Sequence, residues 1–120
     1  MSTSAFENHV TLSPEGIPEI SPDTAGTILA ACAIIDVRRP DEFNAELGHI
    51  KGAELITLGP DLEKFLRGAD KQKSYLFVCR SGMRSAQATA VALSLGLRGS
   101  ANLKGGMMLW SASGLAVERA

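Results

Sequence analysis

The sequence predicts an α/β fold with a mainly parallel sheet and helices on both of its faces. Short apolar runs alternate with amphipathic segments along the chain, and this is the pattern of successive strand and helix units. The run at residues 75–78 is continuously apolar, as expected of a strand that is buried on both faces. A chain of 120 residues fits one domain of this kind and is large enough to bury a core without metal or disulfide support.

The amino-terminal segment differs from the rest of the chain. Residues 1–16 are polar and mixed, and we interpret them as a flexible lead or an arm on the surface. The domain itself is predicted to span residues 17–120. It begins with a short strand over residues 17–20, placed at an edge of the sheet because proline is tolerated there.

Helix starts are marked by residues with defined capping roles. Ser21 and Pro22 suit the N-cap and the first position of a helix. Pro40, followed by two acidic residues, predicts a short helix. Residues 59–60, a Gly-Pro pair, begin another helix, for which Gly68 is a plausible stop.

The remaining strands and helices complete the alternation. Short apolar runs predict strands at residues 33–37 and 75–78, and further strands are expected at residues 54–58 and 100–103. A helix is expected from about Ser85, and its predicted apolar face consists of Ala86, Ala90, Leu93 and Leu97. A terminal helix is predicted from Met107 and ends near Gly114.

Composition restricts the partners and the compartment. The formal net charge is −1, so no overall charge attracts nucleic acid or an anionic membrane. The longest apolar stretch, residues 28–35, is far too short to span a bilayer, and the N-terminus lacks the features of a secretory signal. The only cysteines, Cys32 and Cys79, predict reduced thiols and a cytoplasmic protein. The cysteines and the two histidines show no zinc-ligand spacing, and we expect neither a metal nor a cofactor.

The segment Cys79–Ser85, Cys-Arg-Ser-Gly-Met-Arg-Ser, carries the strongest functional signal. It joins a predicted buried strand to a helix, and ligands of open α/β sheets bind at the carboxyl ends of the strands. Backbone N–H groups of such a loop can converge on the sulfur and on an anion beside it. Gly82 permits the positive φ that this requires, and Arg80 and Arg84 add positive charge. We therefore predict that Cys79 ionises easily and acts as a nucleophile. Cys32, among alanines, is interpreted as a small packed residue.

Two substrate classes suit a thiolate in a cradle of N–H groups. Phosphate esters are attacked at phosphorus, and thiosulfate-like donors at the outer sulfur. Four residues separate Cys79 from Arg84, one fewer than cysteine phosphatases typically have, and this shorter loop favours a single sulfur held as a persulfide. A phosphatase or arsenate reductase stays an alternative, as does a non-catalytic module that carries sulfur or senses it for a partner.

In three stretches the sequence resembles the single-domain rhodanese family, the thiosulfate sulfurtransferases. The stretches are Ile-Asp-Val-Arg-Arg-Pro-Asp-Glu-Phe with Gly-His-Ile-Lys-Gly-Ala (within residues 35–53), the cysteine loop, and Asn-Leu-Lys-Gly-Gly with a later Trp (residues 102–110). The resemblance covers roughly residues 17–118 and implies a rhodanese-like fold with five strands. It departs from the family at residues 54–58, where members often have Asn-Ile-Pro.

The resemblance also implies an enzymatic sulfur-transfer cycle. Cys79 would take the outer sulfur of thiosulfate or of a persulfide donor and pass it to cyanide or to a thiol such as thioredoxin, glutathione or dihydrolipoamide. Backbone N–H groups of residues 80–84 would hold the persulfide. Besides the catalytic Cys79, the predicted substrate-binding residues are Arg80, Ser81, Gly82, Met83, Arg84, Asp36 and Arg38.

Individual roles follow from the same resemblance. Arg84 is expected to steady the loop and neutralise the donor, whereas Arg80 either binds the same anion or is a solvated loop residue. Asp36 is expected to pair with an arginine, for which Arg84 is a candidate. Met83 at the tip of the loop would shape the access of the acceptor, and His49 is expected to be structural.

Overall fold

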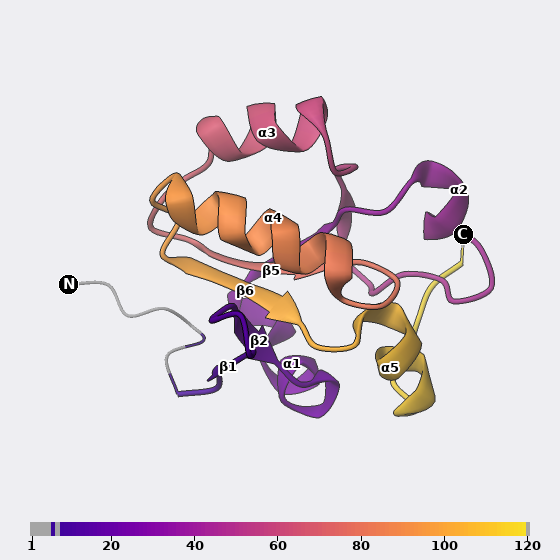
Figure 1. Cartoon of the computed structure of the whole chain (residues 1–120). Helices are drawn as coiled ribbons and strands as arrows, with labels where there is room; N and C mark the ends of the chain where they lie inside the picture. The colour runs from indigo at the N-terminus through magenta and orange to yellow at the C-terminus, as the bar shows by residue number, and fades with distance from the viewer. Residues whose placement is uncertain (1–5, 7, 120) are drawn as a thin grey trace.

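A computed structural model describes residue 6 and residues 8–119, and it contains one six-stranded sheet (Figure 1). The strands are arranged in the order β1-β2-β6-β5-β3-β4. All neighbouring pairs are parallel except β1 and β2, which are antiparallel. The strands are β1 (Thr11–Leu12), β2 (Pro18–Ile20), β3 (Ala33–Asp36), β4 (Glu54–Leu55), β5 (Ser74–Val78) and β6 (Gly99–Leu103).

Helices cover both faces of this sheet, as predicted. Side chains of α1 and α5 belong to one hydrophobic cluster, and those of α3 and α4 to another on the opposite face (Figure 1). The helices are α1 (Pro22–Ile28), α2 (Pro40–Phe43), α3 (Pro60–Arg67), α4 (Met83–Ser94) and α5 (Gly106–Ala112), and a short 3₁₀ turn, η1 (Leu29–Ala31), follows α1. The predicted fold class is therefore confirmed.

The central strand β5 shows how the sequence builds both clusters. Leu76 and Val78 pack toward α1 and α5, whereas Tyr75 and Phe77 pack toward α3 and α4. Successive strand residues point to opposite faces, so a strand covered on both sides must be apolar at every position. Cys79 continues this alternation on the α4 side.

Two differences from the sequence analysis concern the strands. The structure has a sixth strand, β1, within the segment that we interpreted as a lead, and it pairs with β2. Because β1 takes the outer position, β2 is not the edge strand that Pro18 led us to expect. Phe6 is also buried in the core, with 2% of its surface exposed. The domain boundary between residues 16 and 17 stays a prediction, and residues 1–5 and 7 of the segment lie outside the described residues.

The predicted apolar face of α4 is wrong. The helix begins at Met83, and its buried residues are Ser85, Ala88, Thr89 and Ala92. Ala86 and Leu93 are only half-buried, and Ala90 is exposed. Small side chains let the helix lie close to the sheet, and this close approach brings the first turn of α4 against the cysteine loop.

The described residues contain neither a membrane-spanning helix nor a cluster of metal ligands. None of their helices is long and apolar enough to cross a membrane. No group of three or more His, Cys, Asp or Glu side chains among residues 6 and 8–119 could hold a metal ion.

Candidate active site

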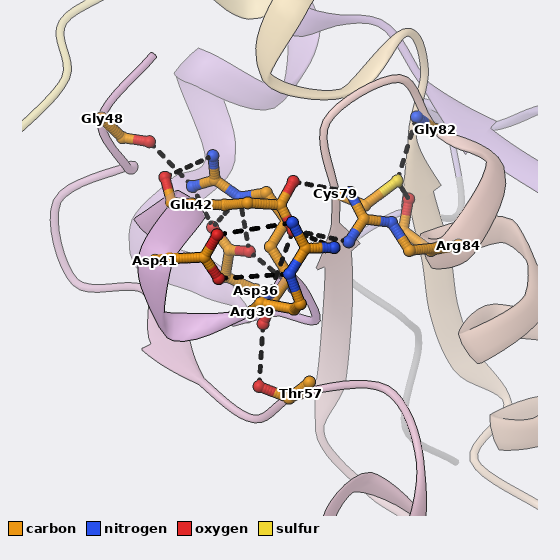
Figure 2. A network of polar contacts seen from close by, with 11 residues as sticks. Asp36, Arg39, Asp41, Glu42, Gly48, Thr57, Cys79, Gly82 and Arg84 are labelled. Atoms are coloured by element: carbon orange, nitrogen blue, oxygen red, sulfur yellow. Dashed lines mark hydrogen bonds and ion pairs between the residues drawn. The ribbon is translucent and has the colours of Figure 1, made fainter. Parts of the chain in front are cut away.

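Cys79 lies at the carboxyl end of β5, in the loop that leads into α4 (Figure 2). Only 1% of its surface is exposed. Its Sγ accepts a hydrogen bond from the backbone N–H of Gly82 at 3.1 Å. Gly82 has φ +100°, a backbone conformation that residues other than glycine rarely adopt. The glycine therefore turns the loop so that its own N–H points back at the sulfur.

The loop offers further donors. Among the described residues, no acceptor is found for the backbone N–H groups of Arg80, Ser81, Met83, Arg84 and Ser85. Three of these are the first N–H groups of α4, which have no acceptor within their own helix. Unpaired N–H groups in a loop and at the start of the helix that follows it are suited to binding an anion.

The start of α5 holds the loop from the other side. The N–H of Met107 donates to the Cys79 carbonyl at 2.8 Å, and the N–H of Met108 donates to the Arg80 carbonyl at 3.0 Å. Gly106 lies directly against these two carbonyl groups. The backbone of Cys79 and of the residue after it is therefore held by a second helix.

Ser85 and Asn102 complete the surroundings of the sulfur, and the sequence analysis gave neither of them a role. The Ser85 hydroxyl lies 3.2 Å from Cys79 Sγ and 2.5 Å from Asn102 Oδ1. Asn102 Nδ2 donates to the Gly82 carbonyl at 3.0 Å. All five residues of β6 are buried, and an amide side chain within a predicted strand was the signal in the sequence that could have pointed to Asn102.

Asp36 pairs with Arg38 and not with Arg84, which corrects the expected pairing. The Arg38 guanidinium makes three hydrogen bonds to the Asp36 carboxylate at 2.7–3.1 Å, and both side chains are buried. It also donates to the carbonyls of Glu42 and Gly48, at 3.2 and 2.7 Å. With its donors occupied in this way, Arg38 joins β3, α2 and the loop at Gly48. This geometry gives no support to the predicted substrate-binding role of the pair.

Arg84 pairs instead with Glu42, a residue to which the sequence analysis gave no role (Figure 2). The two guanidinium N–H bonds to the carboxylate measure 2.7 and 2.8 Å. The Glu42 carboxylate also accepts from the backbone N–H of Arg39 at 3.1 Å, which closes the first turn of α2. The hydrogen bonds from Arg84 lower the pKa of Glu42 to about 2. The pair joins the start of α4 to α2 and balances the charge of Arg84 within the protein, and the role of Arg84 in steadying the loop stays a prediction.

This pair should make the stability depend on pH. The pKa of Glu42 falls from an ordinary value of 4.5 to about 2 on folding, so its contribution is fully present above pH 4.5 and is lost as the pH falls toward 2. We expect Glu42→Gln to cost about 1–2 kcal/mol of unfolding free energy at pH 7, a modest figure because solvent reaches Arg84. Urea unfolding of both proteins at pH 7 and at pH 3 measures the difference, which should shrink at the lower pH. An equal difference at both values would contradict this assignment.

Arg80 stays exposed beside the nucleophile. It forms no ion pair with any of the described residues. Its side chain lines a cavity of about 320 Å³ between the cysteine loop and α2, together with Arg38, Glu42, Ala45, Glu46 and Leu47. Arg80, more than Arg84, is thus the cation that remains available to an anionic ligand.

The other candidate residues lie in different surroundings. Met83 is 79% exposed at the first position of α4, and Ser81 is exposed. His49 stacks on Phe43 at 3.8 Å, and its Nδ1 lies 3.0 Å from the Phe43 carbonyl oxygen, as suits a structural loop residue. The Cys32 thiol packs against the core, and burial raises its pKa to about 11, so it is a poor nucleophile at neutral pH.

Comparison with known proteins agrees with this fold. Residues 21–113 match the family described as "Rhodanese-like domain". The Bacillus subtilis protein named "Putative sulfurtransferase YtwF" is 42% identical over 77 residues, which is 64% of this chain and 71% of that protein.

Solved structures are similar along most of their length. A rhodanese-related protein from Thermoplasma volcanium has a TM-score of 0.71 at 26% identity, covering 85% of this chain and 98% of that one. The human single-domain sulfurtransferase TSTD1 has a TM-score of 0.67 at 28% identity, covering 81% and 97%. The chain described here belongs to the rhodanese-like sulfurtransferase family.

Proposed function

We propose that the protein transfers a sulfane sulfur through a persulfide on Cys79. The thiolate attacks the outer sulfur of the donor, and the donor's bond to that sulfur breaks with its electron pair on the leaving group, which is sulfite when the donor is thiosulfate. The acceptor then attacks the outer sulfur of the persulfide, and the electron pair of the S–S bond returns to Cys79 Sγ. This is a two-step cycle with a covalent intermediate.

One observation carries the proposal. Cys79 Sγ already accepts the Gly82 N–H at 3.1 Å, and the neighbouring N–H groups of the loop have no acceptor among the described residues. These donors are available to the outer sulfur of a persulfide, which carries the negative charge of that intermediate. The buried position of Cys79 limits the access of water to it.

The pairing of Arg84 favours sulfur transfer over phosphate chemistry. A cysteine phosphatase needs a guanidinium that is free to bind two oxygens of a phosphoryl group. Here both bonds of the Arg84 fork go to Glu42. Negligible hydrolysis of an aryl phosphate by the purified protein is the expected result.

Donor and acceptor are proposed from the charges and apolar groups around the loop. Arg80 is free to attract thiosulfate or an anionic persulfide donor. Met83, Met108 and Leu109 are exposed apolar side chains, 79%, 49% and 40% exposed, at the starts of α4 and α5. Exposed apolar groups close to a nucleophile favour a thiol acceptor carried by a protein, such as thioredoxin, and glutathione is the small-molecule alternative.

Intact-protein mass spectrometry tests the proposal. Incubation with thiosulfate is expected to add about 32 Da, the mass of one sulfur atom, to the wild-type protein, because a covalent intermediate must form. Cyanide, glutathione or thioredoxin should remove the added mass, and Cys79→Ser should never gain it. No adduct on the wild-type protein under excess donor would contradict sulfur transfer.

Cys32→Ser is the matched control, since it removes the other thiol of the chain. It is expected to gain and lose the sulfur like the wild type. A module that only carries sulfur would acquire the adduct from thiosulfate but release it to a dedicated partner alone, so rapid discharge by cyanide and small thiols distinguishes turnover from storage.

A further inference from the structure

Ser85 and Asn102 form a closed hydrogen-bonded ring with the cysteine loop. Starting at the sulfur, Cys79 Sγ accepts from Gly82 N–H, the Gly82 carbonyl accepts from Asn102 Nδ2, and Asn102 Oδ1 lies 2.5 Å from the Ser85 hydroxyl. That hydroxyl closes the ring 3.2 Å from Cys79 Sγ. All four residues are buried.

The Ser85 hydroxyl faces two acceptors with a single proton. It can donate either to Cys79 Sγ or to Asn102 Oδ1, but not fully to both. The amide orientation of Asn102 is fixed because its Nδ2 donates to the Gly82 carbonyl, so Oδ1 must be the atom that faces Ser85. Rotation about the Cβ–Oγ bond of Ser85 therefore directs its hydrogen bond either to the sulfur or to the amide oxygen.

The charge on the sulfur determines which of the two acceptors receives the hydrogen bond from Ser85. A thiolate is a much stronger acceptor than a neutral amide oxygen, whereas an uncharged sulfur is a weak one. The ring thus contains a donor whose direction depends on the state of the nucleophile.

We infer that Ser85 is a further catalytic residue that stabilises Cys79 as a leaving group, with Asn102 as the positioning residue that accepts the hydrogen bond from the Ser85 hydroxyl while Cys79 carries the outer sulfur. The inference rests on the proposed sulfur transfer. In the persulfide the charge lies on the outer sulfur, and Ser85 donates to Asn102. When the acceptor removes that outer sulfur, the electron pair of the S–S bond returns to Sγ, and the hydroxyl turns toward the new thiolate. No proton leaves Ser85 at any step.

The other charged groups near the sulfur do not take part in this switch. Arg84 of α4 is paired with Glu42 of α2, and Asp36 of β3 is paired with Arg38. Arg80, the next residue in the loop, is exposed. Replacing Ser85 leaves all of these charges in place, so a change in the reactivity of Cys79 can be attributed to the hydroxyl.

The test combines two measurements on Ser85→Ala. Protein loaded with thiosulfate is mixed rapidly with cyanide, and the loss of the persulfide is followed. In the unloaded protein, the rate of Cys79 alkylation by iodoacetamide is measured against pH. We expect discharge to be about tenfold to a hundredfold slower, as for the loss of a hydrogen bond to a charged group. The unloaded Cys79 should also be alkylated more slowly at neutral pH, because its thiolate loses a hydrogen bond, while the persulfide still forms.

Two controls separate the hydroxyl from packing. Ser85→Thr keeps a hydroxyl and should discharge close to the wild-type rate. Ser100→Ala removes another buried hydroxyl, which bonds the Leu97 carbonyl at 2.8 Å and not the sulfur, and should change neither measurement.

Unchanged discharge and an unchanged alkylation profile in Ser85→Ala would overturn the inference. Asn102→Asp gives a second test if that variant does not fold. The carboxylate of this variant should keep the Ser85 hydrogen bond away from the sulfur and should therefore slow discharge as well. Discharge of Asn102→Asp at the wild-type rate would also contradict the proposed change of acceptor. A wild-type protein that never loads sulfur contradicts the proposed function instead, and the alkylation profile then still tests the hydrogen bond from Ser85.

Discussion

Replacing Arg38 by methionine is expected to lower the free energy of unfolding by about 3–5 kcal/mol, the usual cost of leaving a buried charge without its partner. Asp36 and Arg38 have side-chain exposures of 0% and 1%, so water cannot replace the lost guanidinium. The carbonyls of Glu42 and Gly48 lose their donor in the same step. Urea unfolding monitored by circular dichroism measures the change.

The cause can be separated from a simple loss of packing. The double variant Asp36→Asn with Arg38→Met buries no unpaired charge, and it should recover part of the lost stability. Arg67→Met breaks a second arginine–carboxylate contact of 2.8 Å, but Arg67 and Glu63 are 63% and 56% exposed, and the expected cost is below about 1 kcal/mol. Equal costs for Arg38→Met and Arg67→Met would mean that burial does not determine the strength of these pairs.

The sequence was sufficient for the fold and for the position of Cys79, the candidate nucleophile, because both depend on local patterns. Alternating apolar runs predict a parallel sheet covered by helices. A cysteine directly after such a run must lie at the carboxyl end of a strand, and Cys79 does. Gly82 in the following loop predicts the turn that directs an N–H at the sulfur.

The partners of the charged side chains were not predictable in the same way. Asp36 and Arg38 are two residues apart, yet Arg84 seemed an equally good partner for Asp36 until the position of α2 was known. Glu42 and Arg84 are 42 positions apart, and only the packing of α2 beside the cysteine loop brings them together.

The buried face of α4 shows a second limit. Sequence periodicity identifies large apolar residues as the core, but here serine, threonine and alanine face the sheet because the helix lies so close to it. That same close approach puts Ser85 next to the sulfur. The buried helix face that the apolar pattern missed is thus the face that carries a candidate functional residue, Ser85.

Gly106→Ala is expected to lower the initial rate of sulfur loading to one-tenth of the wild-type rate or less. A Cβ at this position would lie 2.6 Å from the Arg80 carbonyl carbon and 2.5 Å from its oxygen, closer than any real side chain approaches, and the contacting atoms are backbone. The loop must shift to make room, and a displacement of about 1 Å at a reacting centre can cost a factor of about a hundred in rate. Initial rates of adduct formation, measured by mass spectrometry, report the loss.

Gly114→Ala separates this clash from backbone strain. Gly114 also has a positive φ, +77° against +59° for Gly106, but a Cβ there would meet nothing within 4 Å. Both variants therefore incur the conformational cost of placing alanine in the left-handed region, on the order of 1–2 kcal/mol. Only Gly106→Ala also pushes against the carbonyls of Cys79 and Arg80, so it alone should lose sulfur loading under conditions where both proteins are folded. Equal loading by the two variants would show that the contact between α5 and the cysteine loop does not position the nucleophile.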